Sequence, residues 1–192
     1  IRDSPTSESP NKKSNNHFIS IEKFDPTNKA YTDLTGRFPV QSSRGNQYIL
    51  VCYSYDSNAI LAEPLRNRSA PEIVKAWTKI NNQLEKSGVE PELYILDNEC
   101  SNDFRDALHN KQISFQLVPP HIHRRNAAER AIQTFKNHFL AGLSSCNPKF
   151  PLREWDRLLA QAVITLNLLR NSRVNPKLSS HAFLFGNFDF NK

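Results

Sequence analysis

The sequence predicts an α/β fold in which helices flank a mixed five-stranded sheet. Apolar runs typical of strands and amphipathic segments typical of helices follow the order β-β-β-α-β-α-β-α-α. Three strands joined by short turns favour an antiparallel meander, whereas strands separated by helices favour parallel pairing with right-handed crossovers. A mixed sheet of five strands satisfies both patterns.

The first elements follow a polar leader. Residues 1–29 are rich in Ser, Asn, Pro and Lys, which predicts a flexible linker. Residues 30–188 are predicted to form one folded domain, and 189–192 a truncated extension. Strands are expected near 30–35, 48–53 and 59–62, with a turn at 41–46 and a strand end before Pro64.

The second half alternates helices and strands. Pro71 is expected to open a helix whose apolar residues recur at helical spacing and which ends at Gly88. The later elements expected are a strand at 93–97, a helix at 102–111, a strand at 113–118 and helices at 126–144, 151–171 and 180–185.

Charge is distributed unevenly along the chain. Of the net +6, residues 1–119 contribute −1 (14 Lys/Arg, 15 Asp/Glu) and residues 120–192 contribute +7 (11 Lys/Arg, 4 Asp/Glu). This asymmetry indicates a polyanionic partner, most often nucleic acid, although a generically basic surface is the alternative.

Other features concern the setting of the chain. It begins with Ile1 and contains no Met, so we expect a piece of a larger polypeptide. No apolar run approaches the roughly 18 residues of a membrane span, so no membrane partner is expected. Cys52, Cys100 and Cys146 form no CxxC pair, which favours buried free thiols in an intracellular setting, the nucleus in a eukaryotic host.

Three acids occupy positions that are costly without a neutralising partner. Asp33 lies in a strand-like run, Asp97 ends the apolar run 93–96, and Glu129 opens an amphipathic helix. Carboxylates converging from two strands and a helix would hold hard cations such as Mg²⁺, or Mn²⁺ experimentally. Two such metals support in-line displacement at phosphorus.

Other readings of these acids stay open. Asn126 and Glu129 also fit a capping box, and Glu129 with Arg125, Gln133 and Lys136 forms a polar stripe that a solvated helix face would also explain. Glu99 is a candidate for an additional ligand, Asp56 is expected to be a turn residue, and His121 with His123 forms a weak metal motif.

Three segments resemble the acidic motifs of retroviral-type integrases, most closely those of copia-like LTR retrotransposons: 31–36 (YTDLTG), 95–99 (ILDNE) and 126–131 (NAAERA). The resemblance spans about residues 30–187. It implies an RNase H-like fold and an Mg²⁺-dependent polynucleotidyl transferase. Such an enzyme processes the 3′ ends of element DNA and joins them to target DNA.

By this resemblance, Asp33, Asp97 and Glu129 are the catalytic and metal-binding residues. The DNA-binding residues implied are Arg124, Arg125, Arg130, Gln133 and Lys136. Between Asp97 and Glu129 lie 31 residues, fewer than the family usually has, and the shortfall falls in the loop 119–125. Glu99 also stands where the family often has Gly.

Two other functions remain open: another RNase H-like nuclease or transposase, and a domesticated, inactive DNA-binding or dimerisation module. Homo-oligomerisation is expected through the helices 71–87 and 151–171. Trp77 and Trp155 are candidate interface anchors because aromatic side chains are enriched at interfaces, with burial in the core as the alternative.

Overall fold

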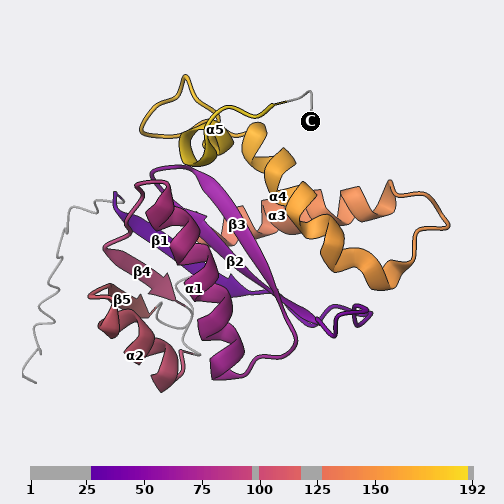
Figure 1. Ribbon diagram of the computed structural model, residues 1–192, viewed down its shortest axis with the longest axis horizontal. Helices are drawn as coiled ribbons and strands as arrows, with labels where there is room; N and C mark the ends of the chain where they lie inside the picture. Colours follow the sequence, from indigo (N-terminus) through magenta and orange to yellow (C-terminus); the bar gives the residue numbers. More distant parts are fainter. Residues whose placement is uncertain (1–26, 97–99, 118–126, 190–192) are drawn as a thin grey trace, which may run out of the picture.

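The computed structural model describes residues 27–96, 100–117 and 127–189, and it contains a mixed five-stranded sheet in the order β3-β2-β1-β4-β5 (Figure 1). The antiparallel part is β1 (Lys29–Leu34), β2 (Tyr48–Ser54) and β3 (Ala59–Leu65). The parallel part adds β4 (Leu93–Leu96) and β5 (Ser114–Leu117) to β1. The predicted sheet is therefore confirmed.

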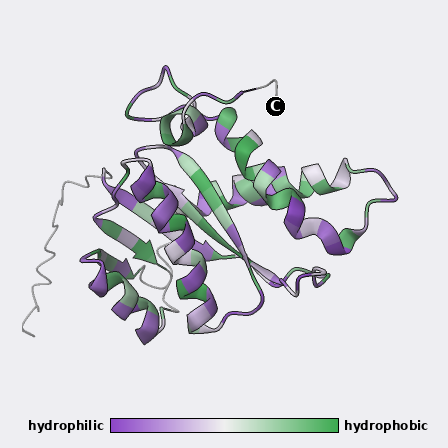
Figure 2. Ribbon diagram, viewed as in Figure 1, coloured by the Kyte–Doolittle hydropathy of each residue, from purple (hydrophilic) through white to green (hydrophobic). Residues whose placement is uncertain are grey.

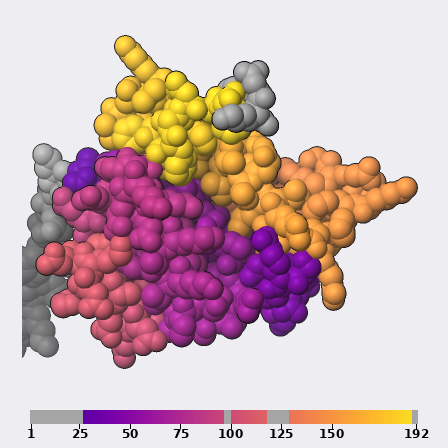
Figure 3. All heavy atoms as spheres, in the orientation of Figure 1, coloured from indigo at the N-terminus to yellow at the C-terminus, as the bar shows by residue number. Residues whose placement is uncertain are grey.

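Helices cover both faces of this sheet. One face carries α1 (Ala70–Lys86) and α2 (Asn102–Asn110). The other carries α3 (Ala127–Ser144), the 3₁₀ helix η2 (Leu152–Arg157) and α4 (Leu158–Leu168), with α5 (Ser180–Phe185) packed against α4. The end of α3 and the segment after it project from the body of the domain (Figure 3).

Period-two alternation along β1 separates two hydrophobic cores. Ala30 packs into the core beneath α1, whereas Tyr31 packs into the core beneath α3. Hydrophobic residues accordingly run along the central strands, while α1 alternates hydrophobic and hydrophilic positions (Figure 2). The turns of α3 that carry Ile132, Phe135 and Phe139 are thereby held on the face of β1 and β2.

Both tryptophans belong to these cores. Trp77 is 1% exposed and meets Tyr94 edge-on at a centroid distance of 5.7 Å, and Trp155 is 0% exposed and stacks on Phe38 at 4.3 Å. The expectation that Trp77 and Trp155 anchor an interface is therefore wrong, because neither side chain reaches the surface. Their breadth fills the space between helix and sheet.

Two predicted boundaries were wrong. β3 does not end before Pro64 but continues to Leu65, which an edge strand allows because its outer side needs no ladder partner. The expected helix 151–171 is split into η2 and α4, and the tighter 3₁₀ spacing puts Leu152 out of phase with the apolar face. Leu152 and Leu169 are 48% and 76% exposed.

The outer side of β3 meets a side-chain amide from α4. Asn167 is fully buried; its Oδ1 accepts the Ile60 N–H at 2.9 Å and its Nδ2 donates to the Ile60 carbonyl at 2.8 Å. The amide thus occupies both outward backbone groups of Ile60. This pair fixes α4 against the sheet.

Two further findings concern thiols and membranes. Cys52 is buried, and burial raises the pKa of its thiol to about 12, while Cys100 and Cys146 are only half-buried.

Among the described helices, none is long and apolar enough to span a bilayer.

Candidate active site

Asp33 lies near the carboxyl end of β1. It is half-buried, and its Oδ1 accepts the Leu34 N–H at 2.7 Å. Side chains two residues apart share one face of a strand, so Asp33 faces the same side as Tyr31, the side covered by α3. The carboxylate is therefore presented where the first turns of α3 approach the sheet.

The second predicted acid follows β4 directly. β4 is parallel to β1, and Thr32 is paired with Leu96, so both strands end at the same edge of the sheet. The expectation that these two strands are neighbours is confirmed. Asp97 itself lies outside the described residues, as does Glu99.

Glu129 lies in the first turn of α3 and is exposed. The core residues that follow it, beginning with Ala131 and Ile132 at 4% exposure each, seat the helix on β1 and β2. Its predicted capping partner, Asn126, lies outside the described residues. Among the residues that the structure describes, no three His, Cys, Asp or Glu side chains form a metal-sized group.

The described part of the polar stripe lies along the surface of α3. Gln133 is exposed and donates to Asn137 at 2.8 Å, and Lys136 is half-buried; Arg130 is also exposed but lies about 100° around the helix from Glu129. Glu129, Gln133 and Lys136 together leave this side of the helix open to a ligand. The remaining predicted DNA contacts, Arg124 and Arg125, lie outside the described ranges, as do His121 and His123.

A small cavity of about 50 Å³ opens at the same edge of the sheet, on the α1–α2 face and not on the α3 face toward which the Asp33 carboxylate is directed; Asp33 is among its lining residues. It lies where β1 and β4 end and where α1 and α2 begin, and Arg68, Cys100 and Ser101 also line it. Sequence reasoning missed these three residues. The available signal was Ser101, which caps α2 by accepting the Phe104 N–H at 3.3 Å, immediately after the second acidic motif.

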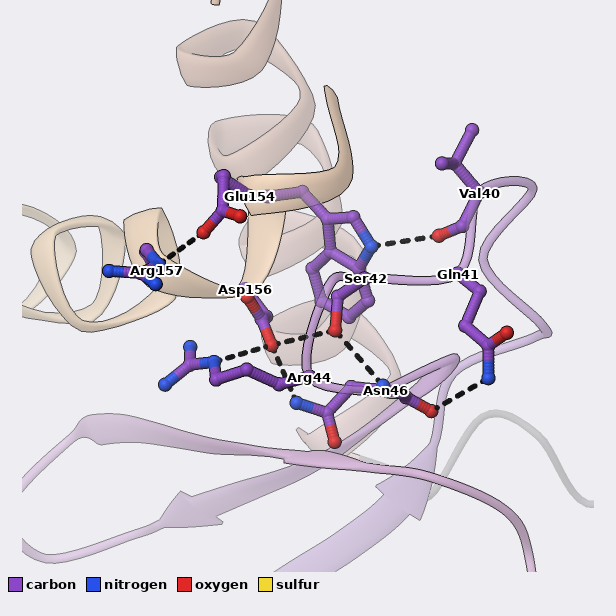
Figure 4. Close-up of polar contacts among 10 residues, drawn as sticks. Val40, Gln41, Ser42, Arg44, Asn46, Glu154, Asp156 and Arg157 are labelled. Atoms are coloured by element: carbon purple, nitrogen blue, oxygen red, sulfur yellow. Dashed lines mark hydrogen bonds and ion pairs between the residues drawn. The ribbon is translucent and has the colours of Figure 1, made fainter. Parts of the chain in front are cut away.

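A buried carboxylate outside this edge was also missed. Asp156 of η2 has a fully buried side chain, and its Oδ2 accepts from Ser42 Oγ at 2.8 Å, Arg44 Nε at 3.0 Å and Asn46 Nδ2 at 2.6 Å (Figure 4). Burial alone would raise the pKa of Asp156, but hydrogen bonds from these three groups together hold it below its ordinary value.

This carboxylate is a structural tie between the β1–β2 connection and η2. The Ser43 N–H donates to the Arg153 carbonyl at 2.8 Å. Trp155 Nε1 donates to the Val40 carbonyl at 2.8 Å (Figure 4). In contrast, Asp56 lies in the turn at 55–58, as expected, and its Oδ2 accepts the Asn28 N–H at 2.7 Å.

The fold is similar to retroviral integrase catalytic cores. A chain of the simian T-cell lymphotropic virus intasome in complex with PP2A regulatory subunit B56 gamma superposes with a TM-score of 0.65 at 17% identity, covering 88% of this chain and 57% of that one. The BIV integrase catalytic core gives 0.59 at 14% identity, covering 82% and 93%. The HTLV-2 core in complex with magnesium, trimeric form, gives 0.61 at 19%, covering 83% and 97%.

These similarities establish the fold: the expected RNase H-like mixed sheet is confirmed. They do not distinguish copia-like integrases from other integrases of the retroviral type. No protein-family model matches the sequence, and no curated protein matches it. The chain spans a little over half of the matched intasome chain, 57%.

Proposed function

We propose that this chain is the catalytic core of a retrotransposon integrase, closest to the copia-like group, which processes 3′ DNA ends and joins them to target DNA. The observation that carries the proposal is the parallel pairing of β1 and β4 with Thr32 opposite Leu96. Asp33 and Asp97 are the next residues along each strand. On a continued ladder their Cα atoms would be about 5 Å apart.

The donor set fits a hard divalent cation. Asp33, Asp97 and Glu129 would supply only carboxylate oxygens, which Mg²⁺ and Mn²⁺ prefer. Two carboxylates on neighbouring strands repel one another unless a cation lies between them, and the exposed Glu129 is accessible as a third ligand. The HTLV-2 core, which has this fold, is a complex with magnesium. Bound metal would lower the pKa of an attacking water or 3′-hydroxyl and stabilise the leaving oxygen.

The chain's own residues would position the nucleic acid. Arg130, Gln133 and Lys136 lie on the same helix as Glu129 and beside it, so phosphates contacting α3 would be held next to the acids. Arg124 and Arg125, which precede this helix, would extend the contact. Contacts of this kind are mostly to the backbone and select little sequence.

A branched duplex that mimics the joined product tests the reaction, because an enzyme that joins strands also catalyses the reverse step. We expect the full chain to resolve the branch and rejoin the target strand in Mg²⁺ or Mn²⁺. Asp33→Asn, Asp97→Asn and Glu129→Gln should each abolish this activity. Cleavage without rejoining would indicate another RNase H-like nuclease or transposase.

Metal binding provides a readout apart from activity. Millimolar Mn²⁺ should raise the Tm of the wild-type chain, because a ligand that binds only the folded state stabilises it. The three acid variants should lose this increase, whereas Asp103→Asn, on the exposed first turn of α2, should retain it. If Mn²⁺ does not raise the Tm of the wild-type chain and the chain also fails to resolve the branched duplex, the domain would be a non-catalytic DNA-binding or dimerisation module.

We also propose that the core self-associates, since joining two DNA ends requires two active sites. The HTLV-2 core is described in dimeric and trimeric forms. With both tryptophans buried, the exposed leucines of the 151–171 segment are the remaining candidates, and Leu169 is 76% exposed. Sedimentation velocity should show a dimer weakened by Leu169→Gln but not by Leu140→Gln on α3; a monomer at all concentrations would contradict the proposal.

A further inference from the structure

Two arginines that follow α4 lie together at the turn between β2 and β3. Arg170 donates from Nε to the Asn58 carbonyl at 2.8 Å and from Nη2 to Asn58 Oδ1 at 2.6 Å. Arg173 donates from Nη2 to the Tyr53 hydroxyl at 3.0 Å, and its guanidinium lies 4.4 Å from the ring centroid of Tyr55. Both guanidiniums are thus fixed by neutral groups.

The two positive charges have no carboxylate partner among the described residues, where the ion pairs involve other side chains. Asp56, in the same turn, directs Oδ2 to the Asn28 N–H instead. The Tyr53 hydroxyl accepts from Arg173 Nη2 at 3.0 Å and donates to Asn58 Oδ1 at 3.0 Å, and the same Asn58 Oδ1 accepts from Arg170 Nη2 at 2.6 Å. Two like charges are thus held within one short chain of hydrogen bonds and repel one another. An anion bound between two such cations would relieve that repulsion.

Tyr31, whose ring centroid lies 6.1 Å from that of Tyr53, does not supply the missing charge. Burial, with the phenols of Tyr53 and Tyr55, raises the pKa of Tyr31 to about 12, so Tyr31 is neutral at pH 7. Arg173 is exposed while Arg170 is half-buried, which leaves one guanidinium edge open to solvent and the other firmly seated. The arrangement is preorganised, and ordering it for a ligand costs little side-chain entropy.

We propose that Arg170 and Arg173 form a phosphate-binding site for the backbone of duplex DNA, separate from the acidic triad. The planar guanidinium matches two phosphate oxygens at once. A polyanion is favoured over a small anion because residues 120–192 carry a net +7. The site uses neither a metal nor a triad residue. An experiment can therefore refute this phosphate site without affecting the proposed reaction, and can refute the reaction without affecting this site.

The site lies at the opposite end of the sheet from the acids. Pairing of Ala30 with Ser54 places the end of β2 beside the start of β1, whereas Asp33 is near the end of β1, about 10 Å further along the strand. Tyr31 and Asp33 share one face of β1. DNA held at both positions would therefore cross the α3–α4 side of the domain.

Fluorescence anisotropy with a labelled 20-base-pair duplex of arbitrary sequence tests the site in the full chain. Arg173→Gln should weaken binding roughly fivefold at about 0.1 M KCl and reduce the magnitude of the log–log salt slope by about 1. Arg173→Lys should retain the slope. The matched control Arg153→Gln, at the other end of the η2–α4 segment, removes an equal charge and should leave the slope unchanged. Equal losses in Arg173→Gln and Arg153→Gln would overturn the proposal.

A second measurement uses the wild-type chain and so does not depend on how variants fold. Phenylglyoxal modifies accessible arginines, and mass spectrometry reports the rate at each one. The duplex should slow modification of Arg173 at least threefold without slowing that of Arg153, and inorganic phosphate at equal phosphate concentration should not. Unchanged modification of Arg173 in the presence of DNA would refute the site, and equal protection by inorganic phosphate would indicate a small-anion site instead.

Discussion

Replacing Asp156 with alanine would remove the acceptor that ties the β1–β2 connection to η2. The variant leaves the buried Ser42 hydroxyl and the Asn46 amide without their acceptor, at about 1–1.5 kcal/mol each. Arg44 has a side chain that is 52% exposed, so water replaces its lost partner and its share is below about 1 kcal/mol. We therefore expect the free energy of unfolding to fall by about 3 kcal/mol.

Urea unfolding followed by circular dichroism measures this loss, and Tm should fall by roughly 6–12 °C in a domain of this size. Arg44→Gln is the matched control and should cost less than about 1 kcal/mol. A loss below about 1 kcal/mol for Asp156→Ala, or an equal loss for Arg44→Gln, would refute this reasoning. It would mean that the tie depends on the surface arginine and not on the buried acceptor.

The carboxylate of Asp156 also predicts how the free energy of unfolding changes at acid pH. Because the folded-state pKa of Asp156 is held below its ordinary value, its stabilisation is present above the unfolded pKa, near 3.9, and is lost as pH falls through the folded pKa. The stability difference between the wild type and Asp156→Asn should thus be constant above about pH 5 and narrow below about pH 4. A stability difference that becomes larger below about pH 4 would contradict the predicted lowering of the pKa of Asp156.

Three further outcomes are expected. Trp77→Ala should lower the free energy of unfolding by about 3–5 kcal/mol, measured in urea, because the side chain is fully buried. Asp97→Asn should abolish strand transfer at an equal or higher Tm, since in the proposed site it removes one of several clustered negative charges; activity retained in Mg²⁺ would contradict it. Neutralising Arg125 and Lys136 together should reduce the magnitude of the log–log salt slope for DNA by about 1–2, and an unchanged slope would place the DNA elsewhere.

Hydrophobic periodicity was enough to predict the sheet and most of the helices. The placement of β1 beside β4 also followed, because short turns and helical crossovers leave few topologies. The polar ties could not be predicted in this way. Asp156 and Ser42 are separated by 114 positions, and Asn167 and Ile60 by 107, so no local pattern relates them.

The residues of the candidate site also differ in whether a local sequence pattern could predict them. Asp33 could be predicted because a carboxylate in an apolar strand is costly without a partner. Arg68 gave no such signal: arginine is ordinary in a polar turn, and only the packing of α1 and α2 against the sheet places it beside Asp33 in the cavity wall. The prediction that Trp77 and Trp155 anchor an interface was wrong for a related reason. An amphipathic helix has the same sequence pattern whether its apolar face packs on a sheet or on a partner.

The contacts along β3 limit how two copies of this domain can meet. An edge strand ordinarily offers a row of unpaired N–H and C=O groups that can recruit another strand, as in sheet extension and aggregation. Here the Asn167 amide already occupies both outward groups of Ile60, and Pro64 has no N–H to donate. A second copy cannot extend the sheet across β3 in register, so any contact between copies on this side must use surfaces other than the β3 edge, and concentrated solutions should remain free of β-rich aggregates seeded at this edge.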